Sequence, residues 1–355
     1  KMTAVAALIF TLPTFASNSI IPVSKETKDM AVSLRDKAIK DDSAYEILKS
    51  LTTEVGARHP GTPGEKAGIE WGVKKLNALG FDKVYTEDVE MNGWLRGVEG
   101  GLEASIVHFA SYADLEKAAD GSLKGKIAFI SNRMERFQDG AGYGPANIAR
   151  SKGHELAAQK GAEALLIRSI GTDDHRNPHT GATNVAMGYT MVPAVALSNP
   201  DADQLVRLIE YGHSPKIRLN IQTKDLGPIV TKNVIGEITG REFPDEVVVI
   251  GGHLDSWDLG TCAVDDGAGV AIAMATATLI KNNTKQAPRR TIRVILWGAE
   301  ELGLIGARAY AKAREADGTI AKHVIGSESD FGAGPVYGLQ SSDNVSPNAL
   351  HVVDT

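Results

Sequence analysis

EVVVIGGH at residues 246–253 is a near-continuous apolar run of strand length. It is followed by GAGVAIAMATATLI at 267–280, which is apolar over about four helical turns, and by a second strand-like run, TIRVILW, at 291–297. Buried strands that alternate with helices are typical of an α/β protein whose sheet contains parallel strands. We therefore predict a mixed, largely parallel sheet flanked by helices.

The same pattern continues on both sides of this stretch. Further strands are expected at 233–238 and 323–329, and a helix at 302–315. Upstream, apolar residues at helical spacing predict a helix over 64–79 that ends at Gly80. These elements belong to one main domain.

Residues 99–226 contain a set of elements of their own and are expected to form a separate unit. Strands are predicted at 126–131, at 162–167 and from Val192, with helices at 145–160 and at 201–212, the second capped by Asp201 or Asp203. We predict four segments: a signal peptide at 1–16, the N-terminal part of the main domain at 17–98, an inserted α+β domain at 99–226, and the core of the main domain at 227–355.

The composition excludes several classes of protein. The chain has 38 Lys plus Arg against 44 Asp plus Glu, a net charge of −6, and no concentrated basic run, so no nucleic-acid partner is expected. The single cysteine excludes an internal disulfide framework and a cysteine-based zinc finger. Lys1 and the apolar run up to Ala16 are typical of a secretory signal that is too short to cross a bilayer. We expect a secreted or periplasmic protein that is not embedded in a membrane.

Charged side chains follow three successive strands of the main domain. They are His253 and Asp255 after the first strand, with Asp265 and Asp266 beyond them, Glu300 and Glu301 after the second, and Asp330 after the third. Ligands of α/β sheets bind outside the carboxyl ends of the strands, so these groups are expected at one edge. Carboxylates gathered there would repel one another unless a divalent cation neutralises them. Imidazole and carboxylate ligands without thiolate suit zinc, with cobalt or manganese as substitutes.

Each of these groups also has a structural explanation when taken alone. Asp265 or Asp266 could cap the following helix, and for Asp266 this is as good an explanation as a site role. The adjacent Glu300 and Glu301 could be first-turn acids that favour a helix dipole, and Asp330 could be a turn residue. Their joint occurrence at three strand ends favours a metal centre. Two ions can share one carboxylate, and Asp265 is placed to be that bridge.

Four motifs resemble, in the same order, those of the M28 family of co-catalytic zinc peptidases: HLDSWD at 253–258, AVDDGAG at 263–269, LWGAEELGLIGA at 296–307 and SESD at 327–330. The likeness is greatest to the secreted carboxypeptidase branch of that family. VGARHPGTPGEKAGIEW at 55–71 resembles its N-terminal segment, and residues 126–209 resemble the protease-associated domain that is inserted in this branch.

The resemblance implies a role for each site residue. His253 and Asp330 would bind one zinc, Glu301 the other and Asp265 both, while Glu300 would be the general base and Asp255 would orient the ring of His253. It also implies a cis peptide bond at Asp265–Asp266 and a further histidine on the second zinc. His323 is expected to be structural, and His351 stands in the wrong motif context. The missing histidine, and the end of the catalytic domain, are therefore expected beyond Thr355.

The expected function is that of a zinc-dependent exopeptidase that hydrolyses short peptides or dipeptides, with a hydroxide bridging two zinc ions and Glu300 as general base. Aminopeptidase, carboxypeptidase and dipeptidase activities share this metal core and stay open. The alternatives are a non-catalytic, receptor-like protein on the same scaffold and a single-zinc transferase of the glutaminyl-cyclase type. The presence of His253, Asp265, Glu300, Glu301 and Asp330 argues against the first. A homodimer is suggested by the family.

Overall fold

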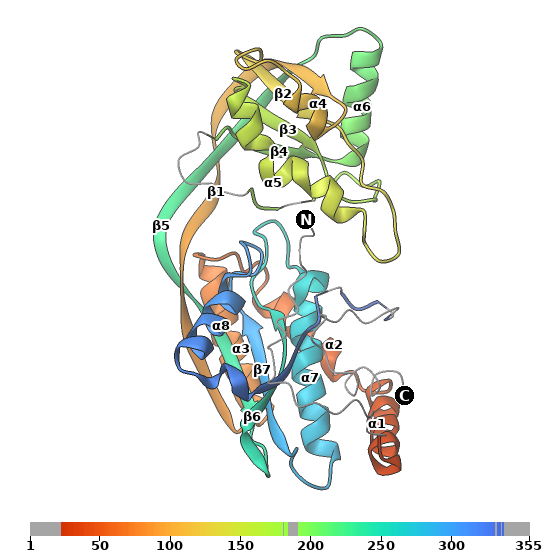
Figure 1. Ribbon diagram of the computed structural model, residues 1–355, viewed down its shortest axis with the longest axis vertical. Helices are drawn as coiled ribbons and strands as arrows, with labels where there is room; N and C mark the ends of the chain where they lie inside the picture. Colours follow the sequence, from red (N-terminus) through yellow and green to blue (C-terminus); the bar gives the residue numbers. More distant parts are fainter. Residues whose placement is uncertain (1–22, 180, 184–190, 331, 335, 337–355) are drawn as a thin grey trace. The chain divides into compact units, whose positions relative to one another are not determined.

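The chain folds into two compact units, shown in Figure 1. The computed structural model describes residues 23–179, 181–183, 191–330, 332–334 and 336. One unit comprises residues 96–224, and the other contains the described residues up to Leu95 and from Asp225 onwards. An insertion was predicted over 99–226. The predicted signal peptide at 1–16 lies outside the described residues.

The main unit is built on a mixed sheet. Its strands run in the order β1 (Lys83–Phe109), β5 (Lys216–Ile238), β7 (Arg290–Trp297), β6 (Phe243–His253) and β8 (His323–Glu328). Strand β6 pairs in parallel with both β7 and β8, whereas β5 pairs antiparallel with β7. In this register His253 lies opposite Trp297, and Gly251 lies opposite Glu328. The carboxyl ends of three strands therefore meet at one edge, and the predicted α/β class with a mixed sheet is confirmed.

Helices cover both faces of this sheet. One face is covered by α2 (Ser43–Glu54), α3 (Pro63–Ala78) and α7 (Ala268–Asn283), and the other by α8 (Ile305–Ala316). Val294 and Leu296 of β7 pack with the first set, and Ile295 packs with α8, because successive side chains of a strand point to opposite faces. The segment Ala263–Asn283 is long and apolar enough to cross a membrane, but the buried residues of α7 belong to this core.

One further α-helix of the main unit is peripheral. Helix α1 (Lys25–Ala38) begins at the N-cap Ser24, whose side chain accepts a hydrogen bond from Thr27 N, and buries no residue. Two short turns also belong to this unit: η1 (Ala263–Gly267), in which Asp265 and Asp266 have non-helical backbone angles, and the 3₁₀ turn η2 (Thr319–Lys322).

The 96–224 unit is an α/β layer arrangement rather than the predicted α+β one. Strands β1, β2 (Lys126–Ile130), β3 (Ala164–Arg168) and β4 (Ala194–Leu197) pair in parallel in that order. Helices α4 (Tyr112–Glu116) and α5 (Tyr143–Gln159) pack on one face, and α6 (Asn199–Glu210) packs on the other. The predicted cap of α6 was wrong. Ser198 caps this helix, because its side chain accepts a hydrogen bond from Asp201 N and so satisfies a free donor of the first turn.

Candidate metal centre

His253 is fully buried at the carboxyl end of β6, and its ring is held in one orientation. Its Nδ1 lies 3.0 Å from the carbonyl oxygen of Asp255. A carbonyl oxygen can only accept, so Nδ1 carries the proton and donates it. Nε2 therefore faces the edge of the sheet, where its lone pair can bind a metal ion once its own proton is displaced.

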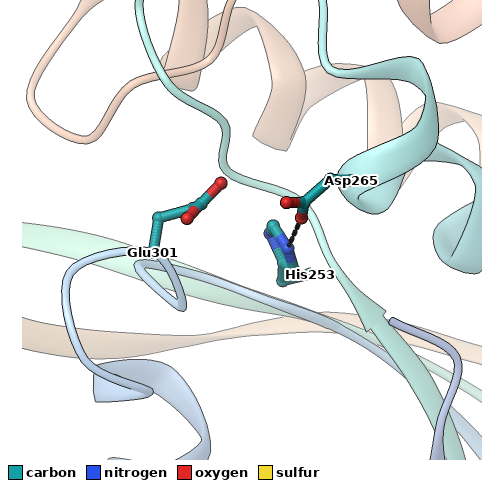
Figure 2. Close-up of side chains that lie close together, drawn as sticks. All are labelled: His253, Asp265 and Glu301. Carbon is teal, nitrogen blue, oxygen red and sulfur yellow. Dashed lines mark hydrogen bonds and ion pairs between the residues drawn. The ribbon is translucent and has the colours of Figure 1, made fainter. Parts of the chain in front are cut away.

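Carboxylates from three other segments converge on this nitrogen. The Nε2 atom of His253 lies 3.0 Å from Asp265 Oδ1, 3.5 Å from Asp330 Oδ1 and 3.8 Å from Glu300 Oε2. Figure 2 shows the side chains of His253, Asp265 and Glu301 pointing toward a common space. The structure thus brings together the residues that the sequence placed at three strand ends.

Two glycines allow the segment around Asp265 to come this close. A Cβ atom on Gly252 would meet Val270 N at 2.5 Å, and one on Gly269 would meet Ser329 O at 1.8 Å. The start of α7 therefore lies directly against the ends of β6 and β8. The peptide bond between Asp265 and Asp266 is cis, as the resemblance implied.

Glu300 and Glu301 lie on a loop before α8, not in its first turn, so the explanation as dipole-favouring acids is wrong. The carboxylate of Asp255 holds this loop. Its Oδ1 accepts a hydrogen bond from Glu300 N at 2.9 Å, and its Oδ2 accepts one from Glu301 N at 3.3 Å. Asp255 was predicted to orient His253. Its backbone carbonyl makes the short contact with that ring, while its carboxylate oxygen is 3.6 Å away.

Asp266 stabilises the centre through backbone hydrogen bonds. It is fully buried, and its two oxygens accept hydrogen bonds from His253 N and Gly269 N, both at 2.9 Å. The capping explanation therefore describes Asp266 well, since it joins the start of α7 to the end of β6.

Burial and crowded negative charge raise the pKa values of the site carboxylates. Burial, reinforced by neighbouring acids and opposed by His253, raises the pKa of Glu300 to about 7 and that of Glu301 to about 8. Burial alone would lower the pKa of His253, but Asp255, Asp265 and Asp330 outweigh it and raise this pKa well above its usual value. Without a cation, His253, Glu300 and Glu301 therefore keep their protons up to a higher pH than these side chains usually do.

The donor set fits a divalent cation in place of those protons. The ligand atoms of His253, Asp265 and Glu301 all lie within 4.8 Å of one another, and those of His253, Asp266 and Asp330 do as well. Among the described residues, the buried Oε1 of Glu301 has no hydrogen-bond partner. A cation would satisfy this atom, and imidazole with carboxylates is a zinc-type donor set.

Of the two downstream histidines, the one that the structure describes, His323, does not join this centre. His323 is buried and bonded at both nitrogens, with Nε2 2.7 Å from the Tyr310 hydroxyl and Nδ1 3.1 Å from Thr319 O. Its predicted structural role is confirmed. His351 lies outside the described residues.

Two buried residues near the centre were not found from the sequence. Arg58 contacts the loop that follows His253, and Asn233 of β5 contacts both ends of the loop that carries Glu300. Arg58 stands in the segment 55–71 that resembles the N-terminal part of the family, but nothing in its spacing indicates that it is buried. Asn233 lies within a predicted core strand, where a polar residue is the one available sign.

Comparisons with known proteins agree with this geometry. The sequence profile of Peptidase family M28 matches residues 233–348. Carboxypeptidase Q of Mus musculus is 31% identical over 332 residues, which cover 86% of this chain and 68% of that protein. The crystal structure of a Peptidase M28 precursor from Shewanella amazonensis is 44% identical with a TM-score of 0.84, and the match covers 87% of this chain and 75% of that one. A zinc aminopeptidase from Bacillus subtilis shares the fold at 21% identity, with a TM-score of 0.52 over 76% of this chain and 64% of that one.

The fold and the candidate centre are those of a metallopeptidase. By its likeness to carboxypeptidase Q and to the Shewanella protein, the chain belongs to peptidase family M28.

Proposed function

We propose that this protein is a zinc-dependent exopeptidase that hydrolyses short peptides or dipeptides. The observation that carries the proposal is the position of the buried Nε2 of His253, which has carboxylates of Asp265 and Asp330 within 3.5 Å of it. His253 and Asp330 would hold one zinc, Glu301 the other, and Asp265 both. The similarity to carboxypeptidase Q and to a zinc aminopeptidase supports the same chemistry.

Bound zinc would supply Lewis-acid chemistry, because it lowers the pKa of a water molecule and polarises the scissile carbonyl group. Glu300 acts as the general base. It takes the proton of the attacking water and returns it to the leaving amine. One feature supports this role: the loop of Glu300 is fixed through its backbone N–H by Asp255.

The 96–224 unit is proposed to be a protease-associated domain, and the protein is proposed to act outside the cytoplasm. Support for the first comes from the separate compact unit in the position where the resemblance placed an insertion. Support for the second comes from the apolar run up to Ala16 and from the single cysteine, which is harmless in an oxidising compartment.

Metal content and substrate preference test the proposal together. The purified protein is analysed for zinc per chain, then assayed on a panel of dipeptides and aminoacyl anilides with and without a chelator. Two zinc ions per chain with chelator-sensitive cleavage support the proposal, and the preferred substrate shows which terminus is trimmed. One zinc per chain with cyclisation of N-terminal glutamine would favour the transferase instead. Absence of both tight metal and cleavage would favour a receptor-like protein.

A further inference from the structure

Arg58 is a fully buried arginine beside the candidate metal centre. Among the described residues it forms no ion pair, and its guanidinium group donates only to backbone carbonyls. These acceptors are the carbonyl oxygens of Leu254 at 2.6 Å, Thr261 at 2.9 Å and Cys262 at 3.4 Å, together with that of Gly56. Burying a charge is costly unless its hydrogen bonds are satisfied. The four carbonyl oxygens around this guanidinium group satisfy its hydrogen bonds, so the local backbone conformation depends on Arg58.

Three of these carbonyls belong to the loop that follows His253 in the sequence. Leu254 directly follows His253, while Thr261 and Cys262 come a few residues before Asp265. Arg58 therefore joins the two ends of the loop 254–262, which separates the two candidate ligands in the sequence. This loop is further fixed by two hydrogen bonds between the backbone of Arg58 and Ser256, from Arg58 N to Ser256 Oγ at 2.7 Å and from Ser256 N to Arg58 O at 3.3 Å.

The backbone at one end of this loop needs such support. Cys262 has a φ of 40°, in the left-handed region that residues other than glycine rarely adopt. Its carbonyl accepts hydrogen bonds from Arg58 and from Gly267 N, the second at 3.2 Å. Space for Arg58 is provided by Gly68 of α3, where a Cβ atom would lie 3.1 Å from Arg58 Cδ.

We propose that Arg58 is a positioning residue for the metal centre, whose planar guanidinium group sets the separation of His253 and Asp265 by holding both ends of the loop between them. This inference rests on the proposed function, because it takes these two residues to be metal ligands. Lysine cannot replace arginine here, since a single ammonium group lacks the fork that reaches several carbonyls at once.

The test compares wild-type protein with the Arg58→Lys and Arg58→Met variants after cobalt substitution. Cobalt absorption reports the geometry of the ligands, competition with a chelator gives the zinc affinity, and dipeptide hydrolysis gives kcat and KM. We expect an altered cobalt spectrum, zinc binding weaker by about tenfold or more, and kcat lower by about tenfold to a hundredfold in both variants. A folded variant with lowered Tm but an unchanged spectrum and kcat would overturn the inference.

A control in the 96–224 unit is Arg168→Met. Arg168 is also buried and donates to two backbone carbonyls, Ser131 O at 2.8 Å and Asn199 O at 3.1 Å, and unlike Arg58 it also forms an ion pair with Asp203 at 2.8 Å. This variant is expected to lower Tm without changing the cobalt spectrum. If Arg58→Met does not fold, Arg58→Lys decides, because it keeps the positive charge but cannot reach several carbonyls at once and should shift the spectrum in the same direction. An unshifted spectrum there would overturn the inference.

The failures of the two proposals are distinguishable. A wild-type protein that binds no metal and cleaves no peptide would defeat the proposed function, and this inference with it. A wild-type enzyme that is active and zinc-loaded, together with Arg58 variants that keep its spectrum and kcat, would defeat the inference alone.

Discussion

The carboxylate of Asp255 accepts a hydrogen bond from the backbone N–H of Glu300 at 2.9 Å. Its other oxygen accepts one from Glu301 N, and its own carbonyl accepts one from the ring of His253. One buried aspartate thus connects the proposed general base, a proposed ligand of one zinc and a proposed ligand of the other. Asp255 therefore helps to fix the relative position of these three groups.

Replacing Asp255 with asparagine should therefore impair activity more than stability. An amide group offers one acceptor and one donor, so one of the two N–H groups of the Glu300 loop would face an NH₂ group. We expect kcat/KM to fall by about tenfold to a hundredfold. Steady-state hydrolysis of the preferred dipeptide measures this. The control is Asp82→Asn, because Asp82 also accepts from a backbone N–H, that of Thr239, but lies away from the centre. Equal losses in both variants would contradict the account.

Asn233 should help to position the same loop, because it contacts both ends of it. Its side chain accepts from Gly298 N and donates to Gly306 O, both at 3.0 Å, and so closes the segment that carries Glu300. Asn233→Asp places a carboxylate oxygen against the Gly306 carbonyl. We expect a destabilisation of about 1–3 kcal/mol and a clear loss of kcat at temperatures where the variant is folded. Urea unfolding and kinetics measure the two effects.

Asn199→Asp is the matched control for that variant. Asn199 is buried in the 96–224 unit and donates to the carbonyls of Gly171 and Asp173. It should lose stability but keep kcat. If Asn233→Asp also keeps the wild-type kcat, the proposed positioning of the glutamate loop is wrong.

Zinc should stabilise the protein more at pH 8 than at pH 5.5. Burial raises the pKa of Glu301 to about 8 and that of Glu300 to about 7 in the metal-free protein. Between about pH 4.5 and 8 the folded state then binds more protons than the unfolded state, so the stability of the metal-free protein falls as the pH rises. Zinc replaces these protons, and its affinity increases about tenfold per pH unit for each proton displaced.

Thermal unfolding with and without zinc across this pH range checks the prediction. The rise in Tm caused by zinc should grow steadily from pH 5.5 to pH 8. A zinc effect that is constant, or larger in acid, would show that the metal does not displace protons from these carboxylates.

The elements around the site were predictable from the sequence because they are buried. The helix expected at 64–79 is found at Pro63–Ala78, and the apolar run at 291–297 is β7. Strand β1, Lys83–Phe109, was not predicted. It is 27 residues long and mixes polar residues and glycines with apolar ones, so it shows no compact apolar run of ordinary strand length. The polar first half of β5 was not predicted for the same reason.

The residue types of the centre were also predictable, since parallel strands deliver their ends to one edge. The supporting contacts were not. Asp255 and Arg58 both bind backbone atoms, of Glu300 and Glu301 in one case and of Leu254 and Thr261 in the other. Every residue has a backbone N–H or carbonyl, so the sequence does not indicate which backbone group a side chain will bind. These contacts can be identified only in the folded structure, where distant segments lie side by side.

The most direct test of the central claim is the Glu300→Gln substitution, examined for both zinc content and peptide hydrolysis. Glutamine keeps the size of the side chain and the backbone hydrogen bond to Asp255 but cannot accept a proton as a base. The account predicts a protein that binds as much zinc as the wild type and whose kcat is lower by about a hundredfold or more. A variant that keeps full activity would contradict the role of Glu300 as general base.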